Sequence, residues 1–156
     1  MKALSIRQPW AHAILYLGKD MENRSRPTKY RGRFYIHAGL KIDDGWRSAR
    51  NHNGRKLFND VDDSKTLTRY GAWSRLGAIL GSVELIDCVN WHCRSRWFSG
   101  KYGYLLARPF MYHTPIPCKG QLGFFTPPRD IWLELEMAEK MRAEWMQGGK
   151  HRFAKS

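Results

Sequence analysis

The sequence predicts an α+β fold, a small and partly closed β-barrel of five to six short strands with surrounding α-helices. Short runs of alternating or β-branched residues recur along the chain and are separated by Gly- and Pro-rich turns. One helical pattern follows the first strand and another lies near the C-terminus, which differs from the strict strand and helix alternation of a parallel sheet. A length of 156 residues fits one compact domain.

The first elements follow from local patterns. Residues 2–6 alternate as a short strand, and Pro9 suits the first turn of a helix of about nine residues that stops at Gly18. The apolar residues of this helix keep helical spacing: Trp10, Ala13, Ile14 and Leu17. A strand at 22–24 puts Glu22 and Arg24 on one side and Asn23 on the other.

Further strands follow the turn at Gly32. Residues 33–39 place Phe34, Ile36 and Ala38 on one face, with Arg33, Tyr35 and His37 on the other. Residues 43–76 read as an inserted, helical or irregular excursion. Residues 77–89 form a strand whose predicted apolar face consists of Ile79, Val83, Leu85 and Val89.

The remaining strands and the last helix complete the predicted domain. A strand at 102–112 is expected to become an edge or to bend at Pro109, and a Pro/Gly-rich turn leads to a final strand. Residues 129–146 read as an amphipathic helix before a frayed basic tail. Its apolar positions are Ile131, Leu135, Ala138, Met141 and Trp145. We therefore expect a barrel over 1–128, with its insertion at 43–76, and a helix and tail over 129–156 that belong to the same domain.

The charge of the chain points to a polyanion. The 27 Lys and Arg residues outnumber the 14 Asp and Glu residues, which gives a formal net charge of +13. Residues 1–59 carry 13 basic and 4 acidic side chains, and residues 88–129 carry 6 basic and none acidic. If these two segments pack together they form one electropositive surface, and nucleic acid is the first partner to expect.

The sequence disfavours membrane and secreted proteins, disulfide frameworks and structural zinc sites. There is no run of 18 apolar residues and no apolar signal-peptide core, so we expect no membrane contact and a cytoplasmic protein. Cys88, Cys93 and Cys118 form no even disulfide framework, and Cys88, His92 and Cys93 lack the paired CxxC spacing of structural zinc. We expect no metal site, no cofactor apart from Mg²⁺ if the protein is a nuclease, and a monomer.

Several spaced motifs resemble one known family. In order they are "RQPWA" at 7–11, "GKDMENR" at 18–24, "RG" at 31–32, "IHA" at 36–38 and "PIPCKGQLG" at 115–123. This series resembles ASCH domains of the PUA-like superfamily over roughly residues 3–126, with 43–76 as the variable part. The resemblance implies a PUA-like barrel and an RNA-binding cleft between the barrel and its helices.

The resemblance also implies catalysis in some family members. One bacterial branch removes acetyl groups from acetylated cytidine, and its lysine in the "GK" motif is followed three residues later by a threonine nucleophile. This chain keeps Lys19 but has Glu22 in the place of the threonine. Lys19 and Glu22 are therefore the candidate catalytic residues, with Glu22 as a general base toward water.

The binding residues are predicted around the first helix and in the basic segments. Free N–H groups at a helix start can receive a phosphate, which singles out Arg7 and Gln8, although Gln8 is equally suited to cap the helix. The full predicted binding set is Arg7, Gln8, Lys19, Arg24, Arg26, Arg31, His37, Lys41 and Lys119. His37 is also suited to a structural, hydrogen-bonded role. Trp91, Trp97 and Tyr102 could stack bases or cover the core.

Four functions remain open at this point. RNA or single-stranded nucleic-acid binding in a basic cleft explains the charge most simply. The alternatives are a small hydrolase that acts on RNA as a ribonuclease or on an acylated cytidine, a reader of a modified base, and an adaptor for an acidic protein. Fold alone does not decide among them.

Overall fold

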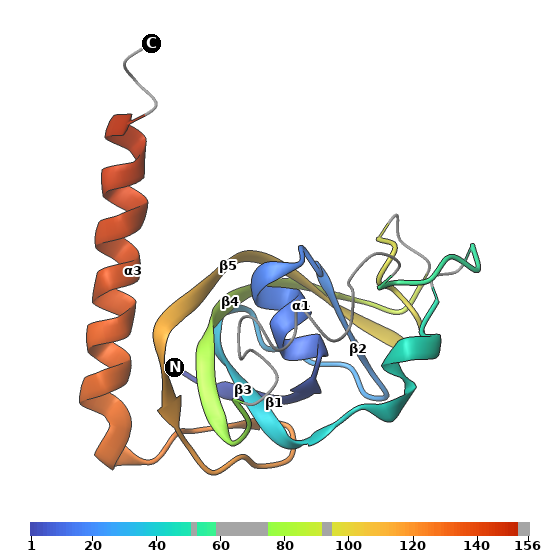
Figure 1. The fold of residues 1–156 in the computed structure, drawn as a ribbon, viewed down its shortest axis with the longest axis horizontal. Helices are drawn as coiled ribbons and strands as arrows, with labels where there is room; N and C mark the ends of the chain where they lie inside the picture. The colour runs from blue at the N-terminus through green and yellow to red at the C-terminus, as the bar shows by residue number, and fades with distance from the viewer. Residues whose placement is uncertain (51–52, 59–74, 92–94, 153–156) are drawn as a thin grey trace.

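A computed structural model describes residues 1–50, 53–58, 75–91 and 95–152, with side chains in those ranges as far as residue 148. Six strands form one curled sheet in the order β2-β5-β4-β3-β1-β6. Their bounds are Ala3–Gln8 (β1), Met21–Arg24 (β2), Gly32–Ile42 (β3), Ala78–Val89 (β4), Tyr102–Pro117 (β5) and Phe124–Phe125 (β6). The curled sheet is a half-barrel, so the predicted α+β class with a barrel-like sheet is confirmed (Figure 1).

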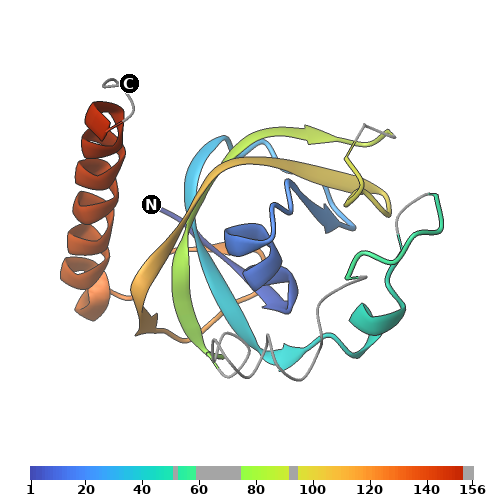
Figure 2. The same cartoon turned by 45° about the horizontal axis from the view of Figure 1, so that its top comes forward.

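Helix α1 (Trp10–Tyr16) lies inside the curve of the sheet (Figures 1 and 2). Its residues Ala11, Ile14 and Leu15 are buried in the main core against side chains of β1, β3, β4 and β5. The helix is shorter than the predicted nine residues because Pro9 precedes it. Gly18 has φ +71°, a conformation that glycine adopts without strain, and it ends the turn as predicted.

Strand β3 presents the face that its alternation predicts. Phe34, Ile36 and Ala38 all belong to the main core inside the half-barrel. Tyr35 points to the opposite face, where a second cluster packs against the C-terminal helix. Because β1 runs parallel to β3 and β4 runs antiparallel to it, this strand holds the centre of the sheet.

Strand β4 does not keep one apolar face along its length. Val83 and Leu85 belong to the main core, but Ile79 lies in the second cluster on the other face of the sheet. The prediction of a single face for these residues is therefore wrong. The pairing with β5 shifts register between Ile79 and Gly81 and again between Ser82 and Glu84, and each bulge changes which side chains point inward.

The irregular pairing of β4 with β5 also accounts for how Pro109 is accommodated in β5. Strand β5 continues through this proline, but its pairing skips from Ala107 to Phe110, and Arg108 takes a positive φ of 52°. Strand β2 pairs only with Tyr102 to Leu105, so the second half of β5 has β4 as its one neighbouring strand. The predicted edge and bend at Pro109 are both confirmed.

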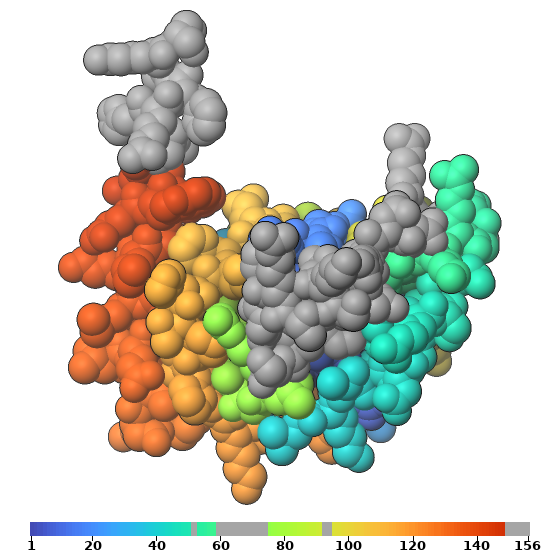
Figure 3. All heavy atoms as spheres, viewed as in Figure 1, coloured from blue at the N-terminus to red at the C-terminus, as the bar shows by residue number. Residues whose placement is uncertain are grey.

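The C-terminal segment forms a short 3₁₀ turn η2 (Arg129–Ile131) and helix α3 (Trp132–Arg152). Leu135 is buried in the second cluster, and Ala138 and Ile131 pack against it. Met141 and Trp145 are largely exposed, so the later apolar positions are not buried as predicted. The Trp145 ring nevertheless lies 6.1 Å from the Phe110 ring of β5. The helix runs beside β5 and extends past the barrel, so its later turns have little sheet to cover (Figures 1 and 3).

The insertion at 43–76 is described in part. It begins with a 3₁₀ turn η1 (Asp44–Ser48), and an isolated bridge joins Arg50 to Lys56. Trp46 and Leu57 are buried there, and Leu57 packs in a third cluster with Trp97. Residues 51–52 and 59–74 lie outside the described ranges.

Within the described ranges, neither α1 nor α3 combines the length and apolar character that a membrane-spanning helix requires.

Candidate functional site

A cavity of about 700 Å³ lies at the open side of the half-barrel. Its walls come from the end of β1, the start of α1, β2, the end of β3, the insertion and the 97–99 segment. Five predicted site residues line it: Arg7, Lys19, Glu22, Arg24 and Lys41. The fold thus gathers the "RQPW" and "GKDMENR" motifs at one place.

A buried chain of charges lies in the wall of this cavity. The Lys19 Nζ donates to Glu22 Oε2 at 2.9 Å and also to the carbonyl oxygen of Met21. The other carboxylate oxygen, Oε1, lies 3.2 Å from Arg24 Nη2. Lys19 is 4% exposed and Glu22 is 8% exposed. A carboxylate buried to this degree requires cationic partners, and it has two.

Local sequence explains this arrangement. Gly18 ends α1 in a left-handed turn, which lets Lys19 fold back toward the helix. The Lys19 ammonium lies 5.8 Å from the Trp10 ring centroid, and Glu22 follows in strand β2. Arg24, two residues further, is on the same side of the strand as Glu22. Its Nη2 donates to the Ser5 carbonyl oxygen at 2.9 Å and so links β2 to β1.

Trp10 has a fixed orientation in the cavity. Its Nε1–H donates to Asp43 Oδ2 at 2.8 Å, and its ring lies 5.2 Å from the Phe58 ring. Asp43 also accepts from the Gly45 amide at 2.9 Å and begins η1. The insertion therefore contributes directly to the cavity, because it anchors the indole that forms part of the wall.

Asn23 holds the opposite wall. Its Nδ2 donates to the Trp97 carbonyl oxygen and its Oδ1 accepts from the Ser99 amide, each at 2.8 Å. This side chain was predicted to point away from Glu22 and Arg24, and it does so by turning to the 97–99 segment. Trp97 is buried, which confirms that it covers the core, and Trp91 is largely exposed.

Cations stand at the mouth of the cavity. Arg7, Lys41 and Arg50 are exposed and line it. Within the described ranges, no carboxylate lies in an ion pair with any of these three. The acids among the described lining residues are Glu22, which is held by Lys19 and Arg24, and Asp43, which is engaged by Trp10. The mouth is therefore electropositive.

Two predicted binding residues are buried away from the cavity. Gln8 accepts from the His12 amide at 3.1 Å through its Oε1, so it caps the start of α1. This was one of its two predicted roles. The His12 amide at the start of this seven-residue helix is therefore occupied by Gln8 and is not free for a phosphate.

His37 has a structural environment. It is 1% exposed, its Nε2 lies 2.8 Å from the Cys118 carbonyl oxygen, and its Nδ1 lies 3.1 Å from Ser5 Oγ. These contacts fit a neutral ring that carries its proton on Nε2. Burial lowers the pKa of His37, although the hydrogen bond to Cys118 acts in the opposite direction. Gly120 packs so closely that a Cβ there would lie 2.5 Å from the ring.

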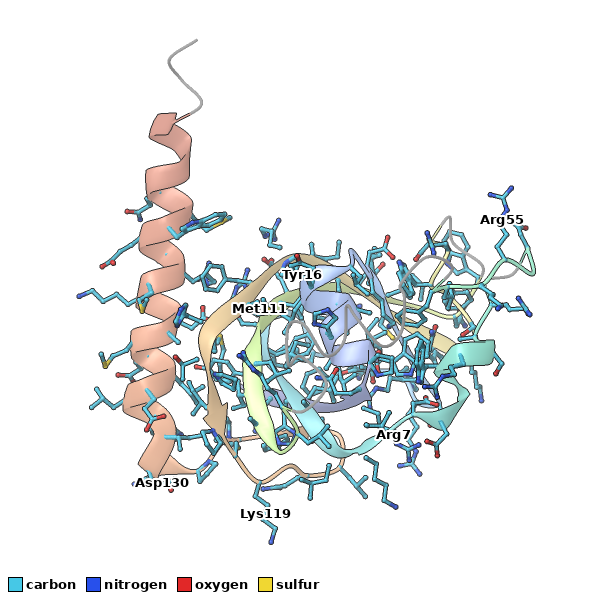
Figure 4. All side chains as sticks on the ribbon, viewed as in Figure 1. Arg7, Tyr16, Arg55, Met111, Lys119 and Asp130 are labelled. Atoms are coloured by element: carbon cyan, nitrogen blue, oxygen red, sulfur yellow. The ribbon has the colours of Figure 1, made fainter. Side chains whose placement is uncertain are left out.

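Three predicted cations lie on the surface outside the cavity lining. Arg26 follows β2 and is exposed, while its carbonyl oxygen accepts from Tyr104. Arg31 pairs with Asp87 at 2.8 Å. Lys119 points into solvent from the loop between β5 and β6, apart from Arg7 (Figure 4). Their predicted contacts with nucleic acid stay predictions.

Sequence reasoning missed several members of the lining: Asp43, Arg50, Asn23, Leu40 and Leu122. Asp43 and Arg50 belong to the insertion, where no periodic pattern indicates what the chain faces. The two leucines read as ordinary strand and turn residues. A clue to Asn23 was its position between Glu22 and Arg24 in a strand that borders the site.

Metal ligands do not gather in the described part of the chain, since no three His, Cys, Asp or Glu side chains converge there. Cys118 is buried and Cys88 half-buried, both as thiols. His92 and Cys93, the other members of the zinc set considered above, lie outside the described ranges.

Comparisons with known protein families and curated proteins identify no relative of this chain. No family model matches the chain, and no curated protein is similar enough to count as a match.

Proposed function

We propose that this protein binds RNA or another single-stranded nucleic acid in the 700 Å³ cavity. The observation that carries the proposal is the charge arrangement of the mouth. Arg7 and Lys41 are exposed cations without a carboxylate partner among the described residues, and the acid beneath them, Glu22, is already neutralised. A polyanion that neutralises such cations releases counterions and gains affinity.

The cavity offers different chemistry at its mouth and at its wall. Phosphates would contact Arg7, Lys41 and Arg50, because these side chains reach solvent. A sugar or base would lie deeper, beside the indole of Trp10 and the Lys19 and Glu22 pair. An aromatic face and a set of buried donors suit one unstacked nucleotide better than a continuous duplex.

The family resemblance supports the same function. We propose membership of the ASCH family and a PUA-like fold, because the spaced motifs at 7–11, 18–24 and 36–38 occur in order. Two of these motifs supply the cavity residues, and the half-barrel is compatible with a small barrel.

A hydrolase is the second candidate, and one contact favours it. Lys19 Nζ lies 2.9 Å from Glu22 Oε2 inside a cavity large enough for a nucleoside. Glu22 could then activate water toward RNA or an acylated cytidine. Both of its carboxylate oxygens are already engaged by Lys19 and Arg24, so binding without catalysis is the function that we favour.

A charge-reversal experiment tests the binding proposal. A labelled single-stranded RNA is titrated with wild type, with Arg7→Glu/Lys41→Glu, and with a Lys140→Glu control on α3. We expect the double variant to lose at least about tenfold in affinity, because two phosphate contacts become repulsive. The control should bind as wild type. Equal binding by the double variant and wild type would refute the cavity as the site.

The same titration examines catalysis. RNA recovered after incubation with and without Mg²⁺ is resolved for products, and an acetylated cytidine is supplied in parallel. We expect intact substrates. Products that form with wild type and disappear with Glu22→Gln would establish the hydrolase instead.

A further inference from the structure

Two exposed leucines stand at the mouth of the cavity. Leu40 is 78% exposed and Leu122 is 100% exposed, and both line the cavity with Arg7 and Lys41. A single exposed leucine needs no explanation, but apolar side chains that gather at a cationic opening indicate an interaction site.

The sheet register places the leucines on either side of Arg7. Ile6 pairs with Ala38 and Gln8 with Ile42, so Leu40 lies beside the end of β1 on the β3 side. On the other side, Leu4 pairs with Phe124, and the residues before Phe124 run toward that same end of β1. Gly120 in this loop lies against Ser5, since a Cβ there would be 2.7 Å from Ser5 Oγ. Leu122 thus approaches from the β6 side.

The result is an alternation of apolar and cationic groups along the mouth. Among the residues that the structure describes, the acids of the cavity lining are Glu22 and Asp43, and both are engaged deeper in its wall. A single strand of nucleic acid presents the matching alternation, with apolar base faces next to anionic phosphates. In a duplex the base faces are stacked on one another and unavailable, so only its phosphates would match.

On the basis of the proposed function, we propose that Leu40 and Leu122 contact the bases of unpaired nucleotides that flank the one in the cavity. Apolar side chains can occupy the space between neighbouring bases and keep them unstacked. The chemical class of ligand is therefore an unpaired stretch of nucleic acid, read through its base faces as well as its phosphates. The leucines give the site its preference over duplex.

The test compares three ligands of equal length and label at low salt. They are a single-stranded RNA, the same strand with abasic residues at its centre, and the same strand in a perfect duplex. The proteins are wild type, Leu40→Ala/Leu122→Ala, Leu122→Phe and the control Leu133→Ala. Leu133 is 68% exposed on α3 and lies outside the cavity lining.

We expect wild type to bind the intact single strand at least about fivefold more tightly than the abasic strand or the duplex, because apolar contact is lost there. The double alanine variant should lose this preference and keep its affinity for the abasic strand. Leu122→Phe should retain the preference, since its ring also packs on a base, and Leu133→Ala should match wild type.

Three results would overturn the inference. The first is equal affinity of wild type for duplex and single strand, and the second is an unchanged preference for the single strand in the double alanine variant. The third is that the double alanine variant loses as much affinity for the abasic strand as for the intact strand, which would indicate an acidic protein or another base-free polyanion as the partner. Failure of wild type to bind any strand would refute the proposed function itself. Binding of all three strands alike would leave that function standing and remove only the role of the leucines.

Discussion

At the scale of single residues, the Lys19 and Glu22 pair is the most consequential contact of the site. Both side chains are buried, so removal of Lys19 leaves the Glu22 carboxylate with Arg24 as its remaining cationic partner, and removal of Glu22 leaves the Lys19 ammonium without a carboxylate. We expect Lys19→Met to lower the free energy of unfolding by about 3–5 kcal/mol. The double variant Lys19→Met/Glu22→Gln should recover part of this loss, because the glutamine oxygen still accepts from Arg24.

Urea denaturation of the four members of this cycle gives the coupling energy between the two residues. We expect a favourable coupling of about 1–3 kcal/mol. Additive losses would mean that the pair is not formed in solution. RNA affinity and product formation measured on the same proteins distinguish a binding protein from a hydrolase. Glu22→Gln should leave binding intact, and it would abolish turnover if the protein were a hydrolase.

His37 supplies a pH dependence of stability. Burial lowers its pKa from the ordinary 6.5, and burial lowers the pKa of His12 in the same way. The unfolded chain therefore takes up protons at a higher pH than the folded protein. Stability is complete above about pH 6.5 and falls as the pH decreases below it. The carboxyls of Glu84 and Glu139, whose pKa values lie below 4.5, contribute only at lower pH.

Thermal unfolding between about pH 7.5 and 5 measures this effect. In His37→Gln we expect a smaller decline than in wild type but not its disappearance, because His12 remains. The variant should also lose about 1–3 kcal/mol at pH 7.5, since partners of the imidazole are left unsatisfied in a buried place. An unaltered pH profile in His37→Gln would contradict the assignment of His37 as a buried neutral histidine.

At the scale of elements, the cavity depends on how the 97–99 segment is attached to β2. Asn23 makes both of the hydrogen bonds that join them. We expect Asn23→Ala to cost about 1–3 kcal/mol of stability, because two backbone groups lose their partner. Hydrogen exchange of the Ser99 amide should quicken by at least about tenfold, and RNA affinity should fall as the wall loosens.

Asn23→Asp is the matched comparison. It keeps the acceptor for Ser99 and loses the donor to Trp97, so exchange at Ser99 should stay close to that of wild type. If exchange at Ser99 were the same in Asn23→Ala as in wild type, another contact would be holding this wall.

At the scale of the whole molecule, the net charge of +13 makes the response to salt a measure of where the ligand lies. Each phosphate contact on a single strand adds about 0.7 to the slope of log affinity against log salt concentration. In Arg7→Ala/Lys41→Ala we expect this slope to decrease by about 1.4. The surface double variant Arg129→Ala/Lys140→Ala removes the same charge from exposed positions outside the cavity lining and outside the predicted binding set, and it should keep the wild-type slope.

The sequence predicts those parts of the fold that depend on short-range patterns. The period of two predicted the inner face of β3 at Phe34 and Ile36. Lys19 and Glu22 were singled out by the family resemblance and not by a spacing rule, and their side chains form an ion pair. The face of β4 was not predictable in this way. Its bulges depend on the approach of Gly81 to β5, where a Cβ would lie 2.2 Å from the Phe110 carbonyl oxygen.

Long-range contacts were not predicted either, because they depend on how the strands pair and not on the spacing of neighbouring residues. Trp10 and Asp43 are 33 positions apart, and only the completed sheet brings them within hydrogen-bonding distance. Leu40 lies in β3 and Leu122 in the loop before β6, and both reach the cavity only through the register of β3 and β6 on β1. Composition predicted an electropositive surface, but the cavity at its centre depends on the topology.

Photo-crosslinking can establish whether a nucleic-acid strand enters the cavity. Single-stranded RNA that carries 4-thiouridine is irradiated with the protein, and the crosslinked peptides are mapped by mass spectrometry. We expect crosslinks within residues 5–10, 39–43 and 119–124. Crosslinks confined to α3 or to the outer face of β4, with none in these three segments, would contradict this expectation.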